Sequence, residues 1–487
     1  MVNRDTVTKS LFWKFLERCT AQLCTLIIGI ILARLLAPED FGALSILLVF
    51  VNLSVILTEA GFNSALIQKV DTDDIDYSTV LIISLLIASS LYVLLFLLSP
   101  FIASFYSYPG LDQTMKVLAL VLYPNAIKSV FTAKVSREFQ FKKLFYANLG
   151  GSLLSGLVGI IMAYEGFNLW ALVAQQLLGS LIICIILRFQ LKWWPAWKYS
   201  KNRAKRLFSF GWKLMFANIA DTLFADIRTL IVGKAFSTQT LGFYTQAKQY
   251  PQAISTNINS SIGSVMLPAL SSVQDNIETV KSMTRRAIKT STYLVFPVLL
   301  GFAAISDSFV MLVLSEKWSP SIILIKILCV MFLFEPIITI NSQARNSIGK
   351  SDIHLRIVSI GKTIDIGILL FSWLVFNTIE AIAIGQVISS AFNAVIGGVV
   401  NKRLIGYKIK EQILDITPNL LLSVIMFCAA SLFSFHHLSY FSTLIIQLAV
   451  GCIVYISLST IFNNQSFLYI KSFIVQKIIR SHDTKQN

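Results

Sequence analysis

The fold of this chain is decided by "FWKFLERCTAQLCTLIIGIILARLLAPEDFGALS" (residues 12–45) together with "GWKLMFANIADTLFADIRTLIVGKAFSTQTLGFYT" (residues 211–245). Laid over each other with one residue of slip, the two stretches pair Trp13-Lys14 with Trp212-Lys213, Arg34 with Lys234 and Phe41-Gly42 with Leu241-Gly242. The matches keep their order and spacing, which indicates an internal repeat. Repeats with an even number of spans share one orientation and are related by an axis along the membrane normal.

The composition is that of a membrane protein. Of the 487 residues, 55% are hydrophobic and only 14% are charged, whereas about 25% of a typical soluble protein is charged. Apolar runs of roughly 20 residues, long enough to cross a bilayer, recur with connections too short to form a soluble domain. We predict an all-α polytopic membrane protein with about 14 transmembrane helices, at residues 11–34, 42–67, 78–104, 114–133, 145–164, 168–188, 207–233, 241–268, 287–313, 322–343, 354–376, 380–400, 414–433 and 441–462.

The longest and most basic connection is "RFQLKWWPAWKYSKNRAKR" (188–206), which follows the sixth predicted span. A linker between two lobes is expected at this place, and the last two spans have no counterpart in the repeat. The predicted domains are therefore an N-terminal lobe (1–188), a basic cytoplasmic linker (189–206), a C-terminal lobe (207–404), two added helices (405–463) and a basic cytoplasmic tail (464–487).

Basic residues gather in alternate connections, such as Lys142 and Lys143 in one and Arg285 and Arg286 in another, while the remaining connections are almost devoid of them. By the positive-inside rule the basic connections are cytoplasmic, so we expect both termini to be cytoplasmic. This topology signal explains much of the net charge of +16. Anionic lipid attracts such segments, so membrane lipids rather than nucleic acid are the expected partners.

Two predicted spans carry polar stripes. A charged side chain at the centre of a span costs about 2.5–3.5 kcal/mol on insertion scales, so it usually faces protein or a wet cavity. In the first span the stripe follows helical steps of three and four, through Lys14, Arg18, Gln22, Thr25 and Gly29. In the eighth span it consists of Thr245, Lys248, Gln249, Gln252, Thr256, Asn259 and Gly263. The longer stripe predicts a water-filled cavity.

The seventh span, 207–233, carries charges of both signs. Asn218, Asp221 and Arg228 share a helical face, whereas Asp226 lies about 200° from Arg228 around the helix. Asp226 and Arg228 therefore cannot neutralise each other within this helix. We expect Asp226 to find its partner on another helix or near the interface, and Arg228 to point elsewhere.

Cations inside the spans are candidate substrate contacts. Arg18, Lys248 and Arg228 lie deep in their spans, which favours a position in a cavity. Lys14 and Lys213 lie near the cytoplasmic ends of theirs and could extend to the interface, so a structural role is slightly favoured for both.

The candidate carboxylates leave alternatives open. Glu59 lies in the second span and Glu335 in the tenth, where Glu335-Pro336 could mark a kink rather than a functional site. Lys362 and Asp365 in the eleventh span are three residues apart, so they could neutralise each other locally or serve the substrate.

We expect no cofactor and no metal. The stretch "ARNSIGKS" (344–351) ends like a phosphate-binding loop, but its first glycine is replaced by Ala344 and no strand precedes it. We interpret it as a cytoplasmic turn. No Ser/His/Asp or Cys/His arrangement supports covalent catalysis, so an enzyme is not expected.

One segment resembles a known family. "ADIRTLIVGKAFSTQTLGFYTQAKQYPQAISTNINSSIGSVMLPALSSVQDN" (225–276) is similar to the most recognisable segment of bacterial polysaccharide exporters, through Asp226, Gly233, Lys234, Leu241, Gly242, Tyr244, Pro268, Ala269, Leu270 and Ser271. "ARLLAPEDFGALSILLVFVNLSVILTEAGFNSALIQK" (33–69) is similar to the matching piece of the colanic-acid and teichuronic-acid exporter subfamily, and "SEKWSP" (315–320) also fits. The chain is thus identified as a member of the multidrug/oligosaccharidyl-lipid/polysaccharide exporter superfamily, of the Wzx type.

The resemblance implies two six-helix lobes in a V, a cationic central cavity and two extra helices. It implies a flippase that moves an undecaprenyl-diphosphate-linked oligosaccharide to the periplasmic leaflet of the inner membrane, with a polysaccharide polymerase and a chain-length regulator as further partners. On this interpretation Arg18, Arg228, Lys248, Lys14, Lys213 and Lys362 hold the diphosphate, and Gln22, Asn218, Asp221, Gln249, Gln252 and Asn259 line the glycan path. Glu59, Asp226, Glu335 and Asp365 are coupling or structural carboxylates.

Three rival functions remain. A cation-coupled multidrug exporter of the same superfamily needs a deep carboxylate such as Glu59, Asp226 or Glu335, but an excess of buried Arg and Lys would repel cationic drugs. A membrane polymerase or ligase acting on lipid-linked glycans commonly has a sizeable periplasmic loop, which the short outer connections do not provide. A scaffold without transport function leaves the polar stripes unexplained.

Overall fold

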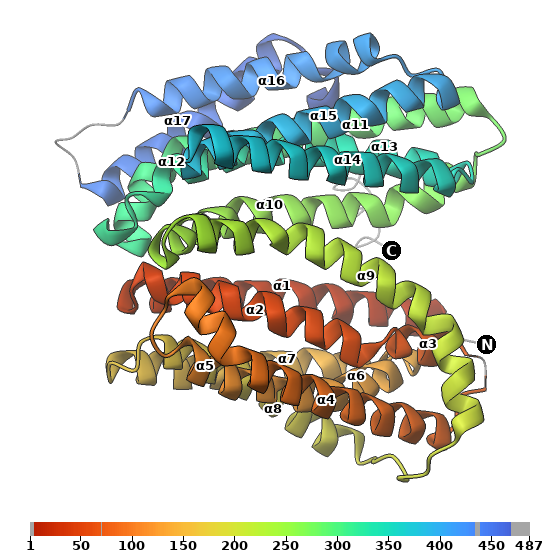
Figure 1. The fold of residues 1–487 in the computed structure, drawn as a ribbon. Coiled ribbons are helices and arrows are strands. Elements are labelled where there is room, and N and C mark those ends of the chain that lie inside the picture. The colour runs from red at the N-terminus through yellow and green to blue at the C-terminus, as the bar shows by residue number, and fades with distance from the viewer. Residues whose placement is uncertain (1–3, 70, 434–438, 469–487) are drawn as a thin grey trace, which may run out of the picture. The chain divides into compact units, whose positions relative to one another are not determined.

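The structure is a computed structural model that describes residues 4–69, 71–433 and 439–468. Within these residues the chain is helical and contains no strand (Figure 1). The contacts divide the chain into two compact units, Met1–Thr245 and Gln246–Asn487. The predicted lobe boundary at residue 207 stays a prediction, and residues 469–487 of the predicted tail lie outside the described part.

The first unit contains α1 (Arg4–Leu35), α2 (Pro38–Glu59), α3 (Phe62–Gln68), α4 (Asp74–Tyr106), α5 (Leu111–Leu118), α6 (Leu122–Arg137), α7 (Phe141–Tyr164), α8 (Leu169–Leu191) and α9 (Lys201–Ala235). The boundary between the units falls inside α10 (Thr238–Ser271). The second unit continues with α11 (Ile277–Phe309), α12 (Ser321–Phe332), α13 (Glu335–Ser347), α14 (Ser351–Phe371), α15 (Ile379–Ile405), α16 (Ile409–Ser431) and α17 (Tyr440–Ile461).

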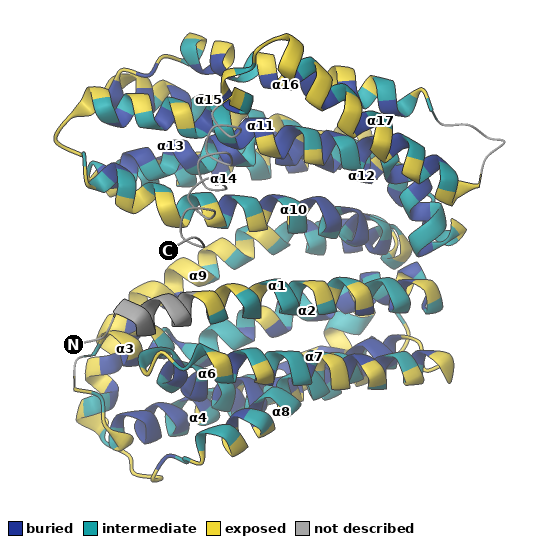
Figure 2. Cartoon of the chain, turned by 180° about the vertical axis from the view of Figure 1, so that it is seen from behind, coloured by how far each residue is buried: buried dark blue, intermediate teal, exposed yellow. Residues whose placement is uncertain are grey.

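The all-α membrane prediction is confirmed. Eleven helical segments in the described residues are long and apolar enough to cross a membrane. The other three predicted spans, 114–133, 207–233 and 241–268, are helical too and correspond to α5 with α6, to α9 and to α10. Many large apolar side chains on the helices are exposed, as a lipid-facing surface requires. Figure 2 marks the exposed residues along the helices in yellow.

Helices within the first unit approach closely through small residues. A methyl group on Gly156 of α7 would lie 2.3 Å from Ile28 of α1, and one on Gly151 would lie 2.3 Å from Ile183 of α8. In a membrane, helices associate by van der Waals packing, which small residues permit. These glycines therefore let α7 pack closely against α1 and against α8.

The connection between α8 and α9 is anchored on the first unit. Trp193 packs edge-on against Tyr77, with ring centroids 5.2 Å apart, and donates its Nε1–H to Asp74 Oδ1 at 2.9 Å. Trp194 packs edge-on against Phe131 at 5.8 Å. These aromatic contacts tie the predicted linker to α4 and α6.

The first turn of α9 continues this anchor. Arg203 forms an ion pair with Asp73, which caps α4, and its Nη1 lies 3.4 Å from Asp76 Oδ1. Asp76 is fully buried and also pairs with Lys69. The hydrogen bond from Arg203 holds the pKa of Asp73 below its usual range.

The repeat in the sequence reappears in the helix boundaries. α1 ends at Leu35 and α2 begins at Pro38, while α9 ends at Ala235 and α10 begins at Thr238. Two residues separate the helices in each case, and the boundaries agree with the alignment of Arg34 with Lys234.

The first turns of α2 and α10 meet through the paired glycines. A Cβ on Gly42 would lie 1.8 Å from the Thr238 carbonyl oxygen, and a Cβ on Gly242 would lie 1.8 Å from the Pro38 carbonyl oxygen. Only a residue without a side chain allows this approach. The two glycines that align in the repeat thus make reciprocal contacts.

Two predicted spans are broken helices. The span 114–133 divides into α5 and α6 around a 3₁₀ turn (Ala119–Val121), just before Pro124. The span 322–343 divides after α12, and α13 restarts at Glu335 with Pro336 in its first turn. Proline lacks the N–H that a helix interior needs but is tolerated in a first turn. The helix therefore breaks at Glu335-Pro336, while the role of Glu335 stays a prediction.

The second unit is held together by hydrogen bonds between helices. Tyr455 of α17 donates its hydroxyl to the Tyr293 carbonyl oxygen of α11 at 2.7 Å, and the Tyr293 hydroxyl lies 3.1 Å from Ser459 Oγ. Buried polar groups in a membrane need such partners. These bonds fix α17 against α11.

Candidate functional site

The predicted residues of α9 differ in burial. Arg228 is 7% exposed and half-buried Asp226 lies two residues before it, whereas Asn218, Asp221 and Lys213 are exposed. The expected common face of Asn218, Asp221 and Arg228 therefore does not share one environment. Arg228 lies on the packed side of α9.

Lys14 at the start of the first stripe has a structural partner. Its Nζ lies 2.8 Å from Glu17 Oε2 and 5.5 Å from the centre of the Phe141 ring. Asn148 of α7 donates to Glu17 Oε1 at 2.7 Å. These contacts agree with the structural interpretation of Lys14, while Arg18, one residue after Glu17, is exposed.

The polar stripe of α10 has two environments. Gln252 is exposed and Gln249 is half-buried, as a path for a polar substrate requires. Asn259 is buried instead and donates its Nδ2–H to Ser255 Oγ at 2.9 Å. Gln252 is therefore accessible, while Asn259 belongs to the packed side of α10. Gln22, which belongs to the polar stripe predicted for the first span, lies in α1 and is half-buried.

Three of the predicted charged residues meet in the second unit. Glu335 of α13 lies within electrostatic range of Lys248 of α10 and Lys362 of α14. All three side chains are half-buried. The sequence placed them in three separate spans and could not show their meeting. Asp365 lies one helical turn beyond Lys362 and is also half-buried.

A carboxylate and a lysine also meet in the first unit. Glu59, the last residue of α2, lies within electrostatic range of Lys128 of α6, and both are half-buried. Lys128 was missed although it lies within the predicted span 114–133. Lys128 could have been found by the same rule as the other candidates, because a charged residue inside a predicted span marks a candidate site.

Sequence reasoning also missed Arg345. It was counted among the basic residues of a cytoplasmic connection, but it lies in the last turn of α13 and is only 3% exposed. Its Nη1 donates to Asn401 Oδ1 at 3.3 Å and to the Gly397 carbonyl oxygen at 3.4 Å. Asn401 in turn donates to Asn341 Oδ1 at 2.8 Å. The sequence of α15 alone does not indicate that Asn401 contacts Arg345 and Asn341.

The two groups of charged residues described above, Glu335 with Lys248 and Lys362 and Glu59 with Lys128, combine carboxylates with lysines. In the described residues no group of three His, Cys, Asp or Glu side chains could hold a metal ion. The stretch 344–351 covers the end of α13, a turn and the first residue of α14. It is a turn between helices, as expected.

Known proteins are similar to this chain in sequence and in fold. The family model described as polysaccharide biosynthesis protein matches residues 31–323. An uncharacterized membrane protein in the cps region of Klebsiella pneumoniae is 26% identical over 393 residues, 80% of each chain. Teichuronic acid biosynthesis protein TuaB of Bacillus subtilis (strain 168) is 25% identical over 357 residues, 73% of each chain.

A solved structure extends the likeness to nearly the whole chain. Lipid II flippase MurJ in an inward closed conformation has a TM-score of 0.74, with 15% sequence identity, and the match covers 93% of this chain and 98% of that chain. At this identity the likeness shows a shared fold.

Proposed function

Because this chain belongs to the polysaccharide biosynthesis protein family, we propose that it is a flippase for undecaprenyl-diphosphate-linked oligosaccharides in surface polysaccharide synthesis. The observation that carries the proposal is the match of this family to residues 31–323 of a chain whose described residues contain eleven helical segments long and apolar enough to cross a membrane. A family that builds polysaccharides needs a membrane step, since glycans assembled on a lipid carrier at one leaflet are used at the other. The fold shared with a lipid II flippase supports the same step.

The charges inside the spans supply a chemical reason. The diphosphate of the substrate cannot enter hydrocarbon without counter-charges, which Arg provides through two parallel hydrogen bonds and Lys as a point charge. Lys248 and Lys362 each lie within electrostatic range of Glu335, and Asp365 lies one helical turn beyond Lys362. Arg18 and Arg228 are the further candidates for this role.

The remaining parts of the substrate find matching surfaces. The exposed amides of α10, such as Gln252, give the glycan hydrogen-bond partners. The polyprenyl tail is as apolar as the lipid and can stay in it. In the proposed cycle, alternating access exposes the site first to one side of the membrane and then to the other, as in other transporters built from repeats.

The location and partners follow from the same role. We place the protein in the bacterial inner membrane with both termini in the cytoplasm, because the basic connections alternate along the chain. A polymerase that receives the flipped unit and a chain-length regulator are the expected protein partners. The protein itself forms and breaks no covalent bond in this proposal.

A cation-coupled multidrug exporter is the second candidate, because half-buried Glu335 could bind H⁺ or Na⁺. The two lysines within electrostatic range of Glu335 argue against it, since each would repel a cationic drug. Drug susceptibility that is unchanged by deletion of the gene would exclude this candidate.

The test of the proposal is a deletion strain whose lipids are extracted. We expect a lipid-linked oligosaccharide to accumulate and the surface polymer to disappear, with both reversed by the wild-type gene. A matched pair of variants sharpens the test. Lys248→Ala should reproduce the deletion, whereas Lys402→Ala, which changes an exposed lysine at the end of α15, should restore export. Normal polymer and no lipid intermediate in the deletion strain would refute the proposal.

A further inference from the structure

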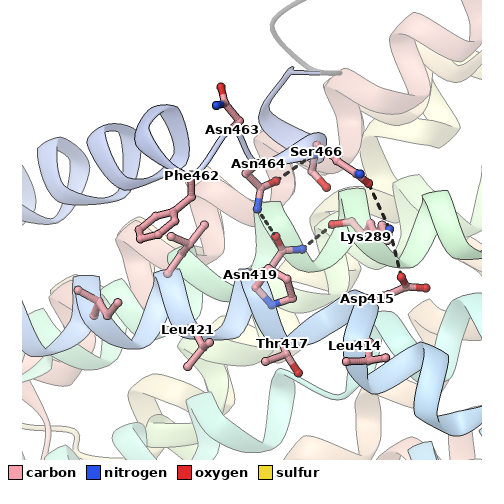
Figure 3. A pocket seen from close by; sticks show the side chains of 14 residues that line it. Lys289, Leu414, Asp415, Thr417, Asn419, Leu421, Phe462, Asn463, Asn464 and Ser466 are labelled. Atoms are coloured by element: carbon pink, nitrogen blue, oxygen red, sulfur yellow. Dashed lines mark hydrogen bonds and ion pairs between the residues drawn. The ribbon is translucent and has the colours of Figure 1, made fainter.

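A cavity outside the predicted substrate residues lies where α11, α16 and the chain after α17 converge (Figure 3). Its volume is about 650 Å³ and it lies entirely within the second unit. A second cavity of about 360 Å³ shares Lys289, Gln465 and Ser466 with it. We define the two together as the α11–α16 cavity.

One wall of the α11–α16 cavity is a fixed polar network. Asn419 of α16 is 2% exposed and donates to the Lys289 carbonyl oxygen and to Thr292 Oγ1, both at 2.9 Å. Asn464 donates to Asn419 Oδ1 at 3.0 Å and accepts from the Ser466 N–H at 2.9 Å (Figure 3). The segment after α17 is thereby held against α11 and α16, so the polar wall is built in advance of any ligand.

The charges at this end of α11 are mostly positive. Arg285 binds Asp415 through Nε at 2.7 Å and Nη2 at 2.8 Å, and Lys289 Nζ lies 3.1 Å from Asp415 Oδ1. Arg285, Arg286 and Lys289 all line the smaller cavity, and no carboxylate does. Three cations therefore face one nearby carboxylate. The next ion pair, Lys281 with Glu411 at 3.0 Å, is neutral overall.

The opposite wall is apolar and faces outward. Leu414, Leu421 and Ile425 on α16 are 62%, 56% and 47% exposed, and Phe462 is 67% exposed. All four line the larger cavity. Because α16 and α17 are long and apolar enough to span a membrane, this wall adjoins the acyl chains of the bilayer. The α11–α16 cavity is thus polar and cationic at one side and apolar at the other.

We propose that the α11–α16 cavity binds an anionic glycerophospholipid of the bilayer. The phosphate lies against Arg286 and Lys289, because charge-assisted hydrogen bonds to phosphate are strong and Lys and Arg are its usual ligands. The acyl chains follow Leu421 and Phe462 into the membrane. Basic pockets between spanning helices on the cytoplasmic side are suited to such headgroups. The bound lipid joins α11, α16 and α17, and this role is independent of the transported substrate.

The experiment compares lipid retention by purified full-length protein. Wild type, Arg286→Gln and Arg286→Gln/Lys289→Gln are incorporated in nanodiscs of phosphatidylcholine with a minor share of phosphatidylglycerol, extracted in detergent and analysed by native mass spectrometry. Lys402→Gln/Arg403→Gln is the matched control, since it removes two exposed cations from the last turn of α15. Each variant is first checked for correct folding by a single peak in size-exclusion chromatography. Arg286 is exposed, so the single variant Arg286→Gln still tests the proposal if the loss of Lys289 prevents folding.

We expect wild type and control to retain phosphatidylglycerol over phosphatidylcholine, and the double variant to retain at least ten-fold less phosphatidylglycerol. Equal retention by all variants, or equal retention of both lipids, would overturn the proposal. Displacement by millimolar inorganic phosphate would also overturn it, because it would indicate a free phosphate site. Preferential capture of undecaprenyl phosphate added to the nanodiscs would assign the cavity to the carrier lipid and contradict it equally.

Discussion

Replacing Gly42 or Gly242 by alanine is expected to disrupt the contact between the first turns of α2 and α10. A Cβ at either position would lie 1.8 Å from a backbone carbonyl oxygen, whereas ordinary contact begins at 3.4 Å. The two backbones must therefore separate by about 1.6 Å (3.4 minus 1.8). Overpacking costs about 1–3 kcal/mol even where side chains can yield. Here the obstacle is backbone, so a cost of at least about 3 kcal/mol is expected, offset by roughly 1 kcal/mol of helix propensity.

The assay is thermal unfolding of the purified protein followed by tryptophan fluorescence. Each variant should unfold several degrees below the wild type and fail to support polymer export. Gly367→Ala is the matched control, because Gly367 lies inside α14 and a Cβ there meets nothing within 4 Å. That variant should unfold at or slightly above the wild-type temperature.

Wild-type stability in both Gly42→Ala and Gly242→Ala would refute the reasoning. It would mean that α2 and α10 do not approach as closely as the structure has them. The reciprocal contact of the aligned glycines would then carry no meaning for the repeat.

Further predictions concern the charged residues. Lys128→Met should lower the free energy of unfolding by about 2 kcal/mol, less than for a fully buried pair, because it leaves half-buried Glu59 without its counter-charge. The double variant Glu59→Gln/Lys128→Met should recover most of the lost unfolding temperature. Additive losses from the two single substitutions would disprove the pairing. Arg18→Ala and Arg228→Ala should abolish polymer export at wild-type membrane levels, while substitution by lysine should keep part of it; normal export by both alanine variants would end the diphosphate assignment. Asp73→Asn should speed proteolysis of the connection before α9 at pH 7. Because the pKa of Asp73 is lowered in the folded protein, its ion pair stabilises this connection above about pH 4 and loses this effect as the pH falls below that value. The cleavage rate of the wild type should therefore approach that of the variant only in acid. Equal cleavage rates at pH 7 would contradict this.

The fold could be predicted from the sequence because its main signals are local. Runs of about 20 apolar residues predict spanning helices wherever they occur, and the structure places a helix at each predicted span. Glu335-Pro336 likewise carries its own signal, since proline restricts the helix at its own position. The predicted spans ending at residues 34 and 233 come within two residues of the helix ends at Leu35 and Ala235.

The contacts between helices could not be predicted, because they depend on which faces meet. Glu335, Lys248 and Lys362 were each singled out alone, and only packing brings them together. Arg345 looked like an ordinary topology signal until α15 provided its partner Asn401. The roles of the predicted substrate residues accordingly stay predictions.

Leaflet-specific labelling of the lipid-linked oligosaccharide tests the central claim most directly. In spheroplasts of a strain without the polymerase, a membrane-impermeant reagent that oxidises glycans reaches only the sugar on the outer leaflet. With the wild-type protein present, a large part of the lipid-linked oligosaccharide should be oxidised, and with the gene deleted it should be protected until the membrane is permeabilised. Equal oxidation in intact spheroplasts with and without the protein would contradict the proposed flippase function.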